Sequence, residues 1–174
     1  MADPAAPDGA SLPSRGAALR APQRLDDLFL YRLAQLQNLA RQPVVRLCER
    51  EAGITRREWR LLALLAEHPG IAPSALAERA GLDRARTSRA LGSLAAKGLL
   101  LRAAAPADRR EARLSLTPAG EAACQRLLPR IAAVNQALLA ELSDAELAQV
   151  DALLQRLHRR AAALRDGNDG TDPG

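Results

Sequence analysis

Leucine and alanine, rather than valine, isoleucine and aromatic residues, supply the apolar side chains of this chain. Apolar residues make up 48% of the sequence, but its aromatic residues are only Phe29, Tyr31 and Trp59. Leucine and alanine favour helices, whereas β-branched and aromatic residues favour strands. The sequence therefore predicts a mainly α-helical fold and argues against a β-sandwich, a β-barrel or a large α/β enzyme. The length of 174 residues fits one domain.

Helix signals divide the chain into six predicted helices. The first begins near Leu25, carries apolar residues at three- and four-residue spacing and ends at Gly53. Pro43 is expected to kink or break it, because proline has no amide hydrogen to donate. Thr55 and Glu58 form a capping box, in which each side chain accepts from the backbone amide of the other, and start the second helix.

Two short helices with a glycine turn between them come next. They are predicted over Pro73–Arg79 and Arg84–Lys97, with Gly81 in the turn and Asp83 as the N-cap of the second helix. Two helices joined by a short turn that contains glycine are typical of a helix-turn-helix. The second helix of this motif enters the major groove of DNA.

A β-hairpin is predicted after this pair, from short runs over Leu99–Arg102 and Ala112–Leu116. The connection between them, residues 103–111, is long and carries several charged residues. We therefore expect it to project from the body of the protein as a basic wing.

Two longer helices complete the pattern. The fifth starts at Pro118 after a Thr117 cap, and Pro129 is expected to bend it. The sixth starts at a second capping box, formed by Ser143 and Glu146. Its apolar residues alternate three- and four-residue steps: Leu147, Val150, Leu154, Leu157, Ala161 and Leu164. An apolar seam of this kind requires a partner helix.

Positive charge is concentrated in one part of the chain. The net charge of the whole chain is +5 at pH 7, and Lys97 is its only lysine. Residues 84–113 alone carry +6, because eight basic residues stand against Asp108 and Glu111: Arg84, Arg86, Arg89, Lys97, Arg102, Arg109, Arg110 and Arg113. Such an excess is either a solvated surface or the electrostatic footprint of a site for a polyanion such as DNA.

The sequence lacks the motifs of membrane proteins, secreted proteins, enzymes and metalloproteins. No apolar stretch approaches the ~20 residues of a membrane span and the N-terminus does not resemble a signal peptide, so a soluble, cytoplasmic protein without a membrane partner is expected. No nucleophile with its base, phosphate-binding glycine loop or metal cluster is evident, so we expect no enzyme activity, no cofactor and no metal. Cys48 and Cys124 lie far apart without CxxC spacing, which predicts reduced, buried thiols.

Two sequences carry a resemblance to a known family: DRARTSRALGSLAAKGLLLR, from Asp83 to Arg102, and DRREARLSLTPAG, from Asp108 to Gly120. Together with the capped helix that carries Trp59, they resemble the multiple antibiotic resistance regulator (MarR) family of winged helix-turn-helix repressors. The resemblance covers about Leu25 to Leu164. It implies a mainly α fold of six helices with a small β-hairpin wing, and a homodimer that binds a pseudo-palindromic operator in double-stranded DNA.

This organisation divides the chain into five predicted segments. They are a disordered N-terminal tail over 1–23, a dimerisation helix over 24–54, a winged helix-turn-helix DNA-binding lobe over 55–117, C-terminal dimerisation helices over 118–165 and a flexible tail over 166–174.

The predicted DNA contacts lie in the first turns of the fourth helix: Arg84, Arg86, Thr87, Ser88 and Arg89. Arginine can donate two hydrogen bonds to guanine, and threonine offers a methyl group to thymine. Arg86 and Arg89 are the first choices for base contacts. Thr87 and Ser88 are alternatively phosphate contacts, which fix the register of the protein on DNA without reading sequence.

The wing supplies three further candidates. The resemblance assigns Arg110 to a narrow minor groove, with Asp108 orienting it through an ion pair. Arg109 is expected to contact phosphate.

The resemblance also implies a small effector, often an aromatic acid, between the dimerisation and DNA-binding lobes, and a role in the response to aromatic compounds. The candidate contacts are Tyr31, Arg32, Asn38 and Trp59, with Arg32 pairing a carboxylate and Tyr31 or Trp59 stacking on a ring. Trp59 is alternatively a core residue, and Arg32 an ion-pair partner on the surface or in the dimer.

Two other functions stay open from the sequence. A regulator of the same fold could sense oxidation through Cys48 or Cys124. A nucleoid-type protein could bind DNA without a preferred site. The sequence does not distinguish repression from activation.

Overall fold

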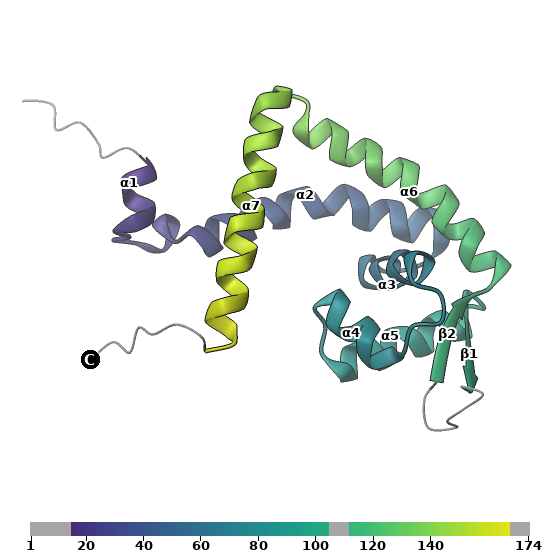
Figure 1. Cartoon of the computed structure of the whole chain (residues 1–174). Helices are drawn as coiled ribbons and strands as arrows, with labels where there is room; N and C mark the ends of the chain where they lie inside the picture. Colours follow the sequence, from purple (N-terminus) through teal and green to yellow (C-terminus); the bar gives the residue numbers. More distant parts are fainter. Residues whose placement is uncertain (1–14, 105–111, 168–174) are drawn as a thin grey trace, which may run out of the picture. The chain divides into compact units, whose positions relative to one another are not determined.

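The computed structural model describes residues 15–104 and 112–167 of the chain. Asp108, Arg109 and Arg110, the three predicted wing residues, lie outside the described residues. The elements, in chain order, are α1 (Arg15–Arg20), the 3-10 turn η1 (Leu25–Asp27), α2 (Phe29–Ala52), α3 (Arg56–Glu67), α4 (Pro73–Ala80), α5 (Arg84–Ala96), β1 (Leu100–Ala104), β2 (Ala112–Leu116), α6 (Pro118–Leu139) and α7 (Asp144–Arg165) (Figure 1).

The mainly helical fold with one small hairpin is confirmed. The described residues form seven α-helices rather than six, because α1 lies within residues 1–23, where a tail without structure was predicted. Its sequence, RGAALR, is too short to show a helical apolar pattern.

The chain divides into two compact units, residues 1–46 and 47–174, and the boundary falls within α2. The helix is continuous from Phe29 to Ala52 with Pro43 inside it, so the expected break at this residue is wrong. A proline within a helix removes the one hydrogen bond that its amide would donate, and the turns on both sides can still form. Pro129 likewise lies inside a continuous helix, α6.

The core of the second unit is built from leucines on α3, α4, α5, the hairpin and α6. The largest fully buried side chains are Ile54, Leu61, Leu62, Leu65, Leu76, Leu91, Leu94, Leu114 and Leu127, together with Thr87 and Cys48. An ion pair also ties the end of α2 to α6 within this unit, since Arg130 Nη1 lies 2.7 Å from Glu51 Oε1.

The hairpin is anchored to the helices by backbone hydrogen bonds. β1 and β2 pair antiparallel with Leu100 opposite Leu116 and Arg102 opposite Leu114. Leu114 also accepts from the Gly70 amide at 2.8 Å and donates to the Ile71 carbonyl at 3.2 Å. The turn between α3 and α4 therefore extends the base of the hairpin, which fixes the strands against the helix-turn-helix.

The junction between the hairpin and α6 has no room for a side chain at Gly120. Thr117 Oγ1 donates to the Gly98 carbonyl at 2.7 Å and accepts from the Gly120 amide at 3.0 Å, which brings the first turn of α6 against the end of α5. A Cβ at Gly120 would lie 2.0 Å from the carbonyl oxygen of Leu99. Because that neighbour is backbone, a larger residue requires the two segments to separate.

Gly120→Ala is therefore expected to lower the free energy of unfolding by about 1–3 kcal/mol, as overpacked sites do. Thermal or urea unfolding measures the change. Gly92→Ala is the matched control: nothing lies within 4 Å of the position of its Cβ, and it lies within α5. This control should raise stability by about 0.5–1 kcal/mol, because alanine is a better helix former than glycine. Equal effects of the two substitutions would contradict the close approach.

Candidate DNA-binding surface

The turn between α4 and α5 has the geometry of a helix-turn-helix. Gly81 ends α4 in the left-handed conformation, with φ 62° and ψ 37°, and the Leu82 amide donates to the Ala77 carbonyl at 3.0 Å. This closure is typical of a helix that ends at glycine. Asp83 then caps α5 by accepting from the Arg86 amide at 2.7 Å. The predicted motif is confirmed.

Helix α5 has one buried side and one exposed side. Its buried residues are Thr87, Ala90, Leu91 and Leu94. Its exposed residues are Arg84, Ala85, Arg86, Ser88, Arg89, Gly92, Ala95 and Ala96. Of the five residues of α5 that were predicted to contact DNA, four therefore lie on the exposed side.

Thr87 is the exception, and the prediction that it contacts DNA is wrong for this structure. The residue is 2% exposed, and its hydroxyl donates to the Asp83 carbonyl at 2.9 Å. It lies four residues before Leu91 and seven before Leu94, so it belongs to the buried stripe of the helix. Its side chain serves packing and local hydrogen bonding.

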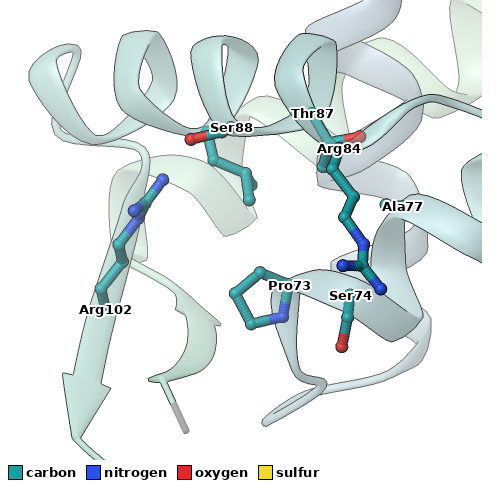
Figure 2. Close-up of a pocket in the computed structure, with 8 residues that line it drawn as sticks. Pro73, Ser74, Ala77, Arg84, Thr87, Ser88 and Arg102 are labelled. Atoms are coloured by element: carbon teal, nitrogen blue, oxygen red, sulfur yellow. The ribbon is translucent and has the colours of Figure 1, made fainter. Parts of the chain in front are cut away.

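A hollow of about 330 Å³ lies between α4, α5 and β1. It is lined by Pro73, Ser74, Ala77, Arg84, Thr87, Ser88, Leu91 and Arg102. Figure 2 shows Arg84 extending from α5 toward Ser74, and Arg102 extending from β1 toward α5 beside Ser88. Two guanidinium groups from different elements thus reach the same hollow, a suitable arrangement for a phosphate.

Arg102 and Ser74 were not among the predicted site residues. Arg102 was visible in the sequence only as one member of the basic segment 84–113. No sequence pattern pointed to Ser74, because it lines the hollow only through the packing of α4 against α5. A contact between segments so far apart in sequence is fixed by the tertiary fold.

Two other cations of the basic segment are engaged by the protein itself. Lys97 Nζ lies 3.0 Å from both carboxylate oxygens of Glu58. Arg113 Nη1 donates to the Gly70 carbonyl at 3.2 Å. Of the basic residues described between 84 and 113, Arg84, Arg86, Arg89 and Arg102 carry the charge that remains for a partner, although Arg86 also pairs with Asp83 at 3.0 Å.

Glu58 connects the start of α3 to the end of α5. Its side chain is only 4% exposed, and it accepts from the Thr55 amide at 2.6 Å in the predicted capping box. Burial on its own raises the pKa of Glu58, but hydrogen bonds from Ser93, Thr55 and Lys97 outweigh burial, and the net pKa is below its ordinary value. The residue is thus a buried carboxylate whose ionised form is favoured by the N-cap of α3 and by Ser93 and Lys97 at the end of α5.

The predicted effector contacts fall in different units. Tyr31 is half-buried and Arg32 and Asn38 are exposed, all three on the part of α2 in the first unit. Trp59 is 8% exposed and belongs to the core of the second unit.

The two cysteines are buried, as predicted. Burial raises the pKa of Cys48, and burial together with the Glu121 charge raises the pKa of Cys124. A raised pKa disfavours the reactive thiolate, so these residues do not favour the redox alternative. In the part of the chain that the structure describes, no group of three or more His, Cys, Asp or Glu residues could hold a metal ion. Among the helices within residues 15–104 and 112–167, none is both long and apolar enough to cross a membrane.

A helix-turn-helix packed against an antiparallel hairpin defines the class of winged helix-turn-helix proteins. Residues 52–111 match the model of the MarR family. The transcriptional regulator HosA of Escherichia coli O111:H- is 30% identical over 112 residues, which cover 64% of this chain and 83% of HosA. The chain therefore belongs to the MarR family.

Other relatives agree with this assignment. A transcriptional regulatory protein proposed for the hcr operon of Thauera aromatica is 36% identical over 62% of this chain, and the match spans 65% of that relative, slightly less than two thirds. The structure of the regulator PcaV from Streptomyces coelicolor with its natural ligand has a TM-score of 0.67 at 29% identity, covering 79% of this chain and 96% of PcaV. The repressor CouR of Rhodococcus jostii RHA1, bound to a 23-mer DNA duplex, has a TM-score of 0.68 at 28% identity, covering 80% of this chain and 96% of CouR.

The buried pair of Glu58 and Lys97 predicts a pH-dependent stability. Because the folded pKa of Glu58 lies below its unfolded value of about 4.3, the pair stabilises the fold above that value. The stabilisation is lost as the pH falls through the folded pKa. Glu58→Gln is expected to lower the free energy of unfolding at pH 7 by about 1–3 kcal/mol, since polar groups near it lose their charged partner.

Urea unfolding at pH 7 and at pH 3 measures this effect, and the difference between wild type and variant should shrink at pH 3. Glu67→Gln, an exposed change on the same helix, is the control and should have little effect at either pH. If Glu58→Gln lowers the free energy of unfolding by the same amount at pH 7 and at pH 3, the charge of Glu58 does not have the proposed role.

Proposed function

We propose that this protein is a ligand-responsive transcriptional regulator that represses its target by binding a pseudo-palindromic operator. The observation that carries the proposal is the set of arginines on the exposed side of α5 and on the adjoining strand: Arg84, Arg86, Arg89 and Arg102. Helix α5 is the second helix of the helix-turn-helix, which is the element that reads base edges. The relative CouR, a repressor bound to DNA, supports this assignment.

The roles of individual residues are part of the proposal. Arg86 and Arg89 contact bases, and Arg84 and Ser88 contact phosphate with Arg102. Arg109 and Arg110 add wing contacts, with Asp108 orienting Arg110.

A homodimer follows from the size of the DNA site and from the apolar surface of the chain. One recognition helix covers only a few base pairs, and a twofold dimer places two such helices in successive major grooves. Helix α7 buries none of its own side chains in the single chain. Its exposed apolar residues recur on one side: Val150, Leu153, Leu154, Leu157 and Leu164. A second copy of the chain is the partner that the proposal assigns to this surface.

The proposed effector is a small aromatic carboxylic acid that releases the operator. The support is the relative PcaV, whose structure contains its natural ligand, and the chemistry of the predicted contacts. Arg32 pairs the carboxylate, Tyr31 stacks on the ring and Asn38 supplies a hydrogen bond. The buried Trp59 is given the core role that was its alternative.

The function is tested by footprinting on the DNA upstream of the protein's own gene. The expected result is protection of one twofold-symmetric site, bound about 10³-fold or more tightly than random duplex at physiological salt. An aromatic acid from a benzoate and cinnamate panel should remove the protection and raise the thermal unfolding temperature. Binding without a preferred site would contradict the proposal and favour the nucleoid-type alternative.

The dimer is tested by placing a charge on the apolar side of α7. Leu157→Glu is expected to raise the dimer dissociation constant more than tenfold and to weaken operator binding with it, because burying a carboxylate in an apolar interface is costly. Sedimentation equilibrium gives the dissociation constant. Ala152→Glu, on the side of the same helix opposite the apolar residues, adds the same charge and should leave the dimer intact. A monomeric wild type would contradict this part of the proposal.

A further inference from the structure

We propose that a second hollow, on a different flank of α5 from the one in Figure 2, holds a backbone phosphate of DNA and that Arg57 on α3 contacts this phosphate. The inference rests on the proposed DNA binding, and it adds to the DNA contacts a residue from outside the recognition helix α5. The hollow has a volume of about 270 Å³ and is lined by Thr55, Arg57, Glu58, Arg86, Arg89 and Ala90.

Three arginines, Arg57, Arg86 and Arg89, are among the residues that line this hollow. Glu58 is the one carboxylate among the lining residues, and Lys97 Nζ lies 3.0 Å from both of its oxygens, so its charge is already compensated. Asp83 pairs with Arg86 at 3.0 Å but is not part of the lining. The hollow therefore carries a net positive charge that favours an anion.

Of these three arginines, Arg57 is the one whose side chain makes no hydrogen bond or ion pair within the described residues. Its side chain is exposed. Arg89, by comparison, donates from Nε to the Ala85 carbonyl at 3.4 Å, which turns its side chain along α5. Like charges that line one hollow repel one another, and a phosphate bound in the hollow offsets this repulsion.

The position of the hollow identifies the anion as a phosphate of the DNA backbone. The major groove is about 12 Å wide and a helix with its side chains about 10–12 Å across, so a helix in the groove has a phosphate wall on each flank. Arg84 and Arg102 serve one flank of α5. Arg86 and Arg89 are rotated away from Arg84 by the helical repeat of 3.6 residues per turn. The hollow beside them therefore lies on another flank of α5, where Arg57 contacts the phosphate wall while Arg86 and Arg89 reach the bases.

The direct test is Arg57→Ala, measured by binding to the operator and to random duplex over a series of salt concentrations. Affinity for both duplexes should fall by the same factor, roughly three- to tenfold, and the slope of log K against log salt should decrease by about 1. Arg57→Lys keeps the charge and should restore the slope. Arg126→Ala, an exposed change on α6 that removes the same charge, should leave the slope unchanged.

Neutral methylphosphonate groups, placed one at a time in the operator, test the same contact from the side of the DNA. One position should weaken wild-type binding and have no further effect on Arg57→Ala, as expected when both changes remove one interaction. An unchanged slope for Arg57→Ala overturns the inference, and so does a loss of affinity for the operator alone, which would indicate base reading.

A free phosphorylated compound is the other source of the same chemistry. Inorganic pyrophosphate is the probe for this source. The assignment to DNA is overturned if pyrophosphate raises the unfolding temperature of wild type but not of Arg57→Ala, and if both proteins show the same slope of log K against log salt for DNA. Failure of the proposed function appears differently, as a wild-type protein without a preferred duplex.

Discussion

The ion pair between Glu58 and Lys97 is the interaction that fixes the orientation of α5, the proposed recognition helix. It joins the first turn of α3 to the residue that ends α5, 39 positions along the chain. The carboxylate is buried, so a rotation of α5 that moved Lys97 and Ser93 away would leave its charge with the Thr55 hydrogen bond but without its cation. That cost is high in a protein interior, and α5 is therefore held in one orientation. The same pairing neutralises the one carboxylate that lines the hollow beside Arg57.

The base of the hairpin is also attached to the helices. Leu114 is bonded through its backbone to Gly70 and Ile71, and Thr117 closes onto Gly98. Gly120 then allows the first turn of α6 to approach Leu99. The start of α6 is consequently attached to the base of the hairpin and to the end of α5. In the proposed regulator, a force on the start of α6 would be transmitted directly to the elements that contact DNA.

Local signals predicted much of this architecture, and contacts between distant segments account for most of what was missed. Thr55, Asp83, Thr117 and Ser143 act as the helix caps that their residue types predict. The burial of Thr87 could also have been found, by extending the spacing of the apolar residues of α5 back by one turn. The pairing of Lys97 could not, because no local pattern links it to Glu58. The same limit hid Arg57 and Ser74, which line their hollows only because separate helices pack side by side.

The distribution of apolar residues gives the proposed dimer a thermodynamic role as well as a geometric one. The leucines of the second unit's core lie mostly between α3 and the first half of α6, whereas those of α7 remain exposed in the single chain. Large exposed apolar surfaces usually mark sites of association, because each buried Å² contributes about 25 cal/mol. Association couples the stability of α7 to subunit concentration. In the proposed dimer, the two recognition helices would be fixed at one separation only where α7 is covered. DNA recognition and the stability of α7 would then depend on the same surface.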